Sequence, residues 1–175
     1  MFSAIEEKSF FAQKVKIKKI FSNSEIKLYY FFHQKTKIYP NNIITIGRFI
    51  FFFVKGENYF KANRFLKTIR IQLKDKKVLI ISSETTLIKL LFSFFPDTYI
   101  HDVRLYKKKN TGKRLINVIF LFYEDRRIAI GRSGDYIKIV NKIFEKYIDL
   151  ENINDTIEIK CVFVNPKCQR DKILS

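Results

Sequence analysis

Two glycines three positions apart mark the stretch of this sequence whose residue types best suit the binding of an anion. The stretch is RRIAIGRSGDYIKIVNKIFEKY, residues 126–147, and the whole chain has only five glycines. Glycine adopts backbone conformations closed to other residues and lets a second backbone approach closely. A helix starting directly after the turn would add free N–H groups and the positive end of its dipole, which favour a phosphate. The turn consists of Gly131, Arg132, Ser133 and Gly134.

The residues after the turn predict a basic amphipathic helix over about 135–148. Apolar residues recur at helical spacing on one side of this helix. Lysines recur every four residues on the other side, at Lys138, Lys142 and Lys146. The lysine stripe would flank any ligand held at the turn. An ordinary turn that leads into a helix with a solvated lysine face is the alternative interpretation.

The charge of the chain favours a polyanionic partner. The formal net charge is +17, and residues 1–81 carry +12 of it. Each phosphate that Lys or Arg neutralises releases counterions, so nucleic acid is the first expectation and anionic membrane the second. Charge that only keeps the protein in solution is the third interpretation. Because 47% of the residues are hydrophobic, a packed core is expected.

The sequence predicts neither catalysis nor a cofactor, metal or small-molecule substrate. No Ser/His/Asp set, phosphate-binding Walker loop or dinucleotide fingerprint is present, and the acids show no pairing suited to general acid–base work. Cys161 and Cys168 match no metal-ligand spacing, and His33 and His101 are remote from them in sequence.

The apolar runs are too short for a membrane span. The longest runs have five and six residues, LYYFF and FIFFFV, against the roughly 20 that a span needs. No targeting segment is expected either, because the first residues include acids and lack an apolar core with a cleavage site. The favoured residues (Lys, Ile, Phe, Asn and Tyr) have A/T-rich codons. We therefore expect the plastid stroma or a bacterial cytoplasm, and no membrane partner.

The elements before residue 82 predict a small antiparallel barrel. Short segments alternate between apolar and polar residues or form aromatic runs, and turn-prone residues separate them. About five strands in under 70 residues, without a convincing long helix, are typical of an OB-like β-barrel. The expected strands lie at 14–20, 25–32, 45–54, 67–73 and 78–82.

The pattern changes after residue 82. The segment SSETTLIKLLFSFFP predicts a buried helix over 82–95, and a hairpin follows over 100–123. A helix, the glycine turn, the basic helix and a last strand over 156–164 complete the order α-β-β-α-α-β. We therefore expect an α+β protein with an OB-like barrel at 14–81, a second domain at 82–165 and a C-terminal tail at 166–175.

The stretch RRIAIGRSGDYIKIVNKIF resembles the GxxG loop of KH domains, which grips about four nucleotides of backbone. The element order points to a type II KH domain. Upstream, IITIGRFIFFFV, KVLIISSETTLIKLLFSFFPD and IHDVRLYKKKNTGKRLINVIF resemble the strand entry, the junction and the hairpin of the NusA transcription factor family. The resemblance covers roughly residues 44–164.

This resemblance implies a non-catalytic protein that binds single-stranded RNA on an OB–KH platform and modulates transcription termination or antitermination. The glycine turn would be the phosphate loop, with Ile128 and Ile130 in the groove for bases. Arg126, Arg127, Lys138 and Lys142 complete the predicted RNA-binding set. RNA polymerase is an expected partner. A KH-containing structural or assembly protein of the small ribosomal subunit is the alternative.

Two further segments could contact RNA. Tyr29, Tyr30, Phe31 and Phe32 could stack on bases, although aromatic residues at strand spacing are also typical of a core. The basic hairpin tip at 107–114, KKKNTGKR, could contact RNA backbone or form a solvated turn.

Overall fold

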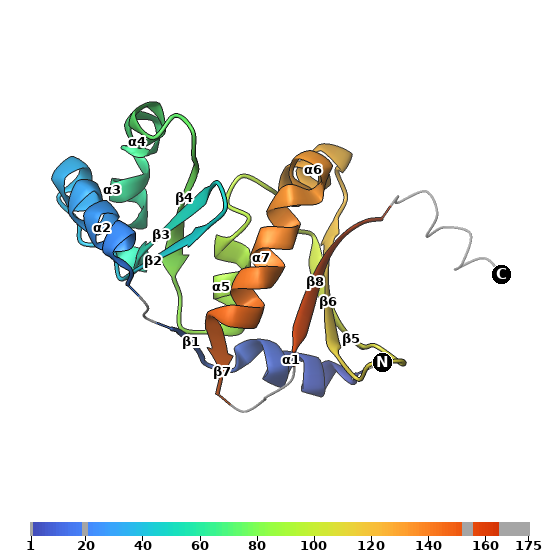
Figure 1. Cartoon of the computed structure of the whole chain (residues 1–175). Coiled ribbons are helices and arrows are strands. Elements are labelled where there is room, and N and C mark those ends of the chain that lie inside the picture. Colours follow the sequence, from blue (N-terminus) through green and yellow to red (C-terminus); the bar gives the residue numbers. More distant parts are fainter. Residues whose placement is uncertain (1, 19–20, 152–155, 165–175) are drawn as a thin grey trace. The chain divides into compact units, whose positions relative to one another are not determined.

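The computed structural model describes residues 2–18, 21–151 and 156–164 (Figure 1). The predicted tail at 166–175 and Cys168 lie outside these ranges. The protein is of mixed α+β class, and its described strands form small open sheets. The chain divides into two compact units, one of residues 14–94 and one that combines residues 1–13 with 95–175.

The unit of residues 14–94 is built on a three-stranded mixed sheet in the order β2-β3-β4. Strands β2 and β3 are antiparallel, whereas β3 and β4 are parallel. Two short helices connect β3 to β4, as a parallel connection requires. The elements are β1 (Val15–Ile17), α2 (Asn23–Thr36), β2 (Asn42–Ile46), β3 (Phe49–Lys55), η1 (Gly56–Asn58), α3 (Tyr59–Asn63), α4 (Leu66–Gln72), β4 (Lys77–Ser83) and α5 (Leu87–Ser93).

Strand β3 forms the centre of this unit because both of its faces are buried. Phe52 on one face stacks on Phe32 of α2, with 4.5 Å between ring centroids. Phe51 and Phe53 on the other face each lie 6.0 Å from the ring of Phe94, directly after α5. An uninterrupted apolar run, rather than alternation, is what a strand covered on both sides requires.

The prediction of an antiparallel barrel over 14–81 is wrong, because two of its five strands are helices. Helix α2 occupies the segment expected to be a strand at 25–32. It starts with a capping box, in which the Ser22 N–H donates to Glu25 Oε2 at 2.7 Å. Helix α4 occupies the segment expected at 67–73, where Ile69 is fully buried and Ile71 is 58% exposed. Short apolar segments are ambiguous between strand and helix when they are read from the sequence alone.

The second unit carries a sheet of the same kind, in the order β5-β6-β8. Strands β5 and β6 form an antiparallel hairpin, and β8 is parallel to β6. Helices α6 and α7 connect β6 to β8, and α7 packs closely on β8 (Figure 1). The elements are α1 (Ala4–Ala12), β5 (Asp102–Lys107), β6 (Arg114–Phe120), α6 (Tyr123–Ile130), η2 (Arg132–Gly134), α7 (Asp135–Lys146), β7 (Ile148–Leu150) and β8 (Ile157–Phe163).

Helix α1 completes this second unit from the opposite end of the sequence. Glu7 Oε1 accepts a hydrogen bond of 2.9 Å from the backbone N–H of Leu105 in β5. The guanidinium of Arg114 in β6 lies over the rings of Phe2 and Phe10, at 5.1 Å and 5.0 Å from their centroids. The first residues of the chain therefore help to hold the hairpin of the second unit.

The two units repeat the order strand–strand–helix–helix–strand. In each, an antiparallel hairpin precedes two helices, and the last strand returns parallel beside the middle one. Each parallel pairing covers seven residues, from Phe49↔Lys77 in one unit and from Arg114↔Ile157 in the other. Sequence inspection predicts this order only for the second unit.

A candidate nucleic-acid interface at the glycine turn

The glycine turn lies between α6 and α7, as the sequence predicts. Gly131 ends α6 with φ 79° and ψ 175°, and its N–H donates to the Arg127 carbonyl at 3.1 Å. Ser133 and Gly134 also have positive φ, 54° and 73°. Three of the four residues in the turn thus adopt the left-handed half of backbone space, which reverses the chain sharply between the helices.

Gly131 has no room for a side chain. A Cβ atom there would lie 2.6 Å from Tyr136 Cβ and 2.9 Å from the Tyr136 N, and it would also meet the Asp135 carboxylate. Around Gly134 the nearest atoms to such a Cβ are 3.8 Å away. The first glycine is therefore required by space and conformation, and the second by conformation alone.

The exposed part of the turn consists of Arg132 and Ser133. Lys138 and Lys142 are exposed one and two helical turns further along α7. Lys138 Cε lies 3.9 Å from the position of a Cβ on Gly134, so its side chain runs back beside the turn. The structure brings the loop and the first lysine together, and Lys142 continues the same face at the i+4 position.

The acid at the start of α7 lies inside this site. The Asp135 carboxylate fills the space against Gly131 that a side chain would otherwise need. A carboxylate in the first turn stabilises the helix through its dipole. It also places a negative charge beside the turn, which weakens the attraction for a phosphate.

The predicted residues on α6 differ in how far they are available to a ligand. Arg127 pairs with Glu124 at 2.7 Å, and Arg126 Nε donates to the Cys161 carbonyl of β8 at 3.2 Å. Ile128 is 51% exposed, whereas Ile130 is half-buried behind the turn. Ile128 is thus an apolar side chain that α6 presents to solvent near the turn, and Arg126 holds α6 on the sheet.

Asn141 is a positioning residue that sequence inspection missed. Its Nδ2 donates to the Ile159 carbonyl at 2.9 Å, and its Oδ1 accepts the Ile159 N–H at 2.7 Å. The side-chain amide thereby pairs with the open edge of β8 as a further strand would. A lone amide among the apolar positions of α7 is the only signal of this role in the sequence.

The other predicted RNA contacts are divided by burial. Phe32 is fully buried and belongs to the core, whereas Tyr30 is 63% exposed on α2. At the hairpin tip, Lys108 is held by Glu158, with Nζ and Oε2 2.6 Å apart. This hydrogen bond from Lys108 holds the pKa of the Glu158 carboxyl below its usual value of 4.5, against an opposing effect of desolvation.

The described residues contain no cluster of three or more His, Cys, Asp or Glu side chains that could hold a metal ion. Cys161 is buried in β8, and desolvation raises the pKa of its thiol to about 12. Among the described residues, no helix has the length and apolar character needed to cross a membrane.

Comparisons with known proteins show a shared fold. No family model matches the chain, and no curated protein does. Twenty-eight chains of solved structures match. One is the crystal structure of APE1850, with a TM-score of 0.56 and 18% identity over 80% of this chain and 100% of that one. At this identity the similarity concerns the fold alone.

Proposed function

We propose that the protein binds single-stranded RNA without catalysing a reaction, and that its second unit is a KH domain of type II order. The observation that carries the proposal is the glycine turn. Gly131, Ser133 and Gly134 all have positive φ at the start of a twelve-residue amphipathic helix. This helix follows a β-hairpin and precedes a parallel strand, which is the setting of a GxxG loop.

In this proposal the turn holds phosphate and α6 contacts the bases. The start of α7 offers backbone N–H groups and the positive end of a helix dipole to an RNA phosphate. Arg132, Lys138 and Lys142 supply charge around it, and Ile128 offers apolar surface to a base. Arg126 and Arg127 contribute positive charge near the site, while Arg127 pairs with Glu124 and Arg126 donates to the Cys161 carbonyl.

The biological role we propose is that of a reduced NusA-like factor that modulates transcription elongation and termination. The ordered resemblance of residues 44–164 to that family supports this role. The proposed factor does not include the OB-like barrel that the sequence predicted. A structural or assembly role on the small ribosomal subunit is the alternative, supported by the charge of +17. Recovery of the tagged protein with RNA polymerase after nuclease treatment would favour the first role. Stable retention on ribosomal subunits at high salt would favour the second.

The experiment for RNA binding changes the exposed tip of the turn. We expect Arg132→Asp with Ser133→Asp to weaken binding of single-stranded RNA by about tenfold or more at low salt, because the pair places two acids at the proposed phosphate. Fluorescence anisotropy at two salt concentrations measures the affinity and its salt dependence.

The matched control is Lys8→Asp with Ser9→Asp on α1 of the same unit. Both residues are exposed and adjacent, and the pair changes the net charge by the same amount. Equal loss of affinity in both variants would show that the loss comes from the change in net charge and not from the glycine turn. Unchanged affinity in the turn variant, with circular dichroism showing an intact fold, would refute the proposed phosphate loop.

A further inference from the structure

The unit of residues 14–94 repeats the second unit but lacks its glycine turn. Arg64 and Phe65 connect α3 to α4 at the corresponding position, and both have right-handed helical φ and ψ values. The chain thus bends between the helices without the left-handed residues found at Gly131 and Gly134. If this unit binds an anion, side chains rather than a glycine loop must supply the contacts.

The side chains beside this bend are strongly cationic. Seven of the residues 59–77 are Lys or Arg, and Asp75 is the only acid among them. Arg64 and Lys67 are exposed, and within the described ranges neither forms an ion pair. Uncompensated charge of one sign on a short segment is the electrostatic footprint of a nucleic-acid contact.

One of these cations is fixed in the same way as a residue of the other unit. Arg70 Nε and Nη2 both donate to the Val78 carbonyl on the edge of β4, at 3.0 Å and 2.9 Å. Asn141 makes a similar contact in the other unit, where its Nδ2 donates to the carbonyl of Ile159 on β8. Arg70, however, has five N–H donors and remains charged, so it caps the strand edge and still has donors for a ligand.

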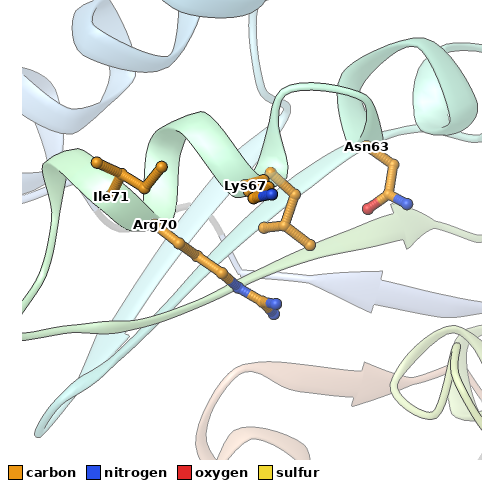
Figure 2. A pocket seen from close by; sticks show the side chains of 5 residues that line it. Asn63, Lys67, Arg70 and Ile71 are labelled. Carbon is orange, nitrogen blue, oxygen red and sulfur yellow. The ribbon is translucent and has the colours of Figure 1, made fainter.

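Two of these cations, Lys67 and Arg70, line an open hollow of about 530 Å³ along α4, which we call the α4 hollow. Asn63, Lys67, Arg70, Leu66 and Ile71 line it. Figure 2 shows the Arg70 side chain running toward β4, with Lys67 and Asn63 further along the same helices and Ile71 at the other end. Ile71 is 58% exposed, so the hollow joins cationic donors to apolar surface.

We propose that the α4 hollow is a second RNA-binding site, in which Lys67, Arg70 and Asn63 hold phosphodiester oxygens and Leu66 and Ile71 contact the base or sugar. The exposed Arg64 beside the hollow contacts a neighbouring phosphate. We take single-stranded RNA as the ligand because the proposed function is RNA binding, and the choice of ligand rests on that proposal. The contact itself does not depend on the glycine turn. It differs from that turn because cationic side chains, rather than backbone N–H groups, neutralise the phosphate.

The test neutralises two exposed cations beside the hollow in the full chain, with Arg64→Gln and Lys67→Gln. The probe is a fluorescein-labelled single-stranded RNA on the order of 16 nucleotides, well beyond the about four that one glycine loop grips. We expect affinity at moderate salt to fall on the order of tenfold and the slope of log K against log salt to decrease by about 1.4, for two lost phosphate contacts. Arg70 stays unchanged because it also holds β4.

The matched control is Lys16→Gln with Lys27→Gln, two exposed lysines of the same unit that remove the same charge. We expect less than a twofold change. Photocrosslinking of RNA containing 4-thiouridine should label peptides that include residues 63–71. If the Arg64/Lys67 variant behaves as the control does, or if these peptides are not labelled, the site is refuted. Equal competition by polyglutamate of matched charge would refute RNA as its ligand.

The two proposals fail separately. Four proteins are compared: the unchanged chain, the Arg64/Lys67 variant, the Arg132/Ser133 variant and the quadruple variant that combines both. Loss of affinity only with the Arg132/Ser133 changes supports the glycine turn and refutes the α4 hollow. Loss only with the Arg64/Lys67 changes supports the hollow and refutes the turn as the clamp. Losses in both, adding in the quadruple variant, support two sites on one RNA.

Discussion

A methyl group on Gly131 would lie within 2.6 Å of Tyr136 Cβ, whereas one on Gly134 would have no neighbour nearer than 3.8 Å. The two glycines of the turn are therefore not equivalent, although the sequence presents them as a symmetric pair. Spacing alone indicates where a turn lies. Which side chains fill the space beside Gly131, here those of residues 135 and 136, depends on how α7 begins.

This difference gives a stability prediction. Gly131→Ala should lower the free energy of unfolding by about 3 kcal/mol, because it combines positive φ with overpacking. Gly134→Ala should lower it by about 1 kcal/mol, the cost of the conformation alone. Urea denaturation measures both. Equal losses of unfolding free energy in the two variants would contradict the conclusion that only Gly131 lacks room for a side chain.

Asp135 gives a second prediction at this scale. Asp135→Asn should tighten RNA binding several-fold, because it removes a negative charge beside the proposed phosphate. It should also destabilise α7 by about 0.5 kcal/mol through the lost interaction with the helix dipole. Glu145→Gln, exposed near the other end of α7, is the control and should leave affinity nearly unchanged. Weaker binding by the Asp135 variant would show that the carboxylate organises the turn for RNA.

Among the elements, those with one strong signal could be predicted and those with two competing signals could not. The basic helix after the glycine turn was placed correctly because Val140 and Phe144 repeat at helical spacing over its length, although α7 ends at Lys146 and Ile148 begins β7. The aromatic run of β3 was also placed correctly. Segment 25–32 was mistaken for a strand because its aromatic residues outweighed the capping box of Ser22 and Glu25.

The site was predicted less completely than the elements. Sequence inspection indicated the turn and its lysines, which are local. It could not show that Arg126 and Asn141 hold β8. The Arg126 contact joins residues 35 positions apart, and the Asn141 contact joins residues 18 positions apart. Nor could sequence inspection indicate the α4 hollow, since segment 67–73 was interpreted as a strand. Lys67 and Arg70 become neighbours at i and i+3 only in a helix.

The hairpin of the second unit gives a pH prediction. The Lys108 hydrogen bond lowers the pKa of Glu158 from 4.5, so the folded state binds its proton less readily than the unfolded chain. The stabilisation is therefore present above the unfolded pKa and is lost as pH falls through the lowered folded value. Lys108→Met should raise the Glu158 pKa toward 4.5 and cost under about 1 kcal/mol at neutral pH.

Carbon-detected NMR titration of the Glu158 carboxyl measures this shift directly. Lys109→Met, a neighbour on the same exposed tip, is the control. An unchanged Glu158 pKa in the Lys108 variant would mean that the 2.6 Å contact is not maintained in solution.

At the scale of the whole molecule, the chain consists of two units with the same strand order. The second unit joins its two helices through the glycine turn, and the unit of residues 14–94 joins them through Arg64 and Phe65. The sequence contains no detectable repeat, because what the units share is backbone topology and the burial of a few apolar positions. In each unit a helix side chain donates to a carbonyl of the last strand of the sheet, Arg70 to Val78 and Asn141 to Ile159. Pairing of this kind depends on sheet register, which local patterns do not specify.

The assignment of α1 to the second unit gives a prediction for the full chain. Deletion of residues 2–13 should destabilise β5 and β6, since it removes Glu7 from Leu105 and the rings of Phe2 and Phe10 from Arg114. Hydrogen exchange should rise in 102–120 and stay unchanged in 42–83. Faster exchange in both segments alike would contradict the division into units.

The same feature bears on how the protein is made. During synthesis helix α1 precedes its partner strands β5 and β6 by about 90 residues, which at about 5–20 residues per second takes on the order of 5–20 s. During that interval Phe10, which is buried in the finished protein, lacks the guanidinium of Arg114 over its ring. We therefore expect a nascent chain that stops before Arg114 to expose this ring to chaperones.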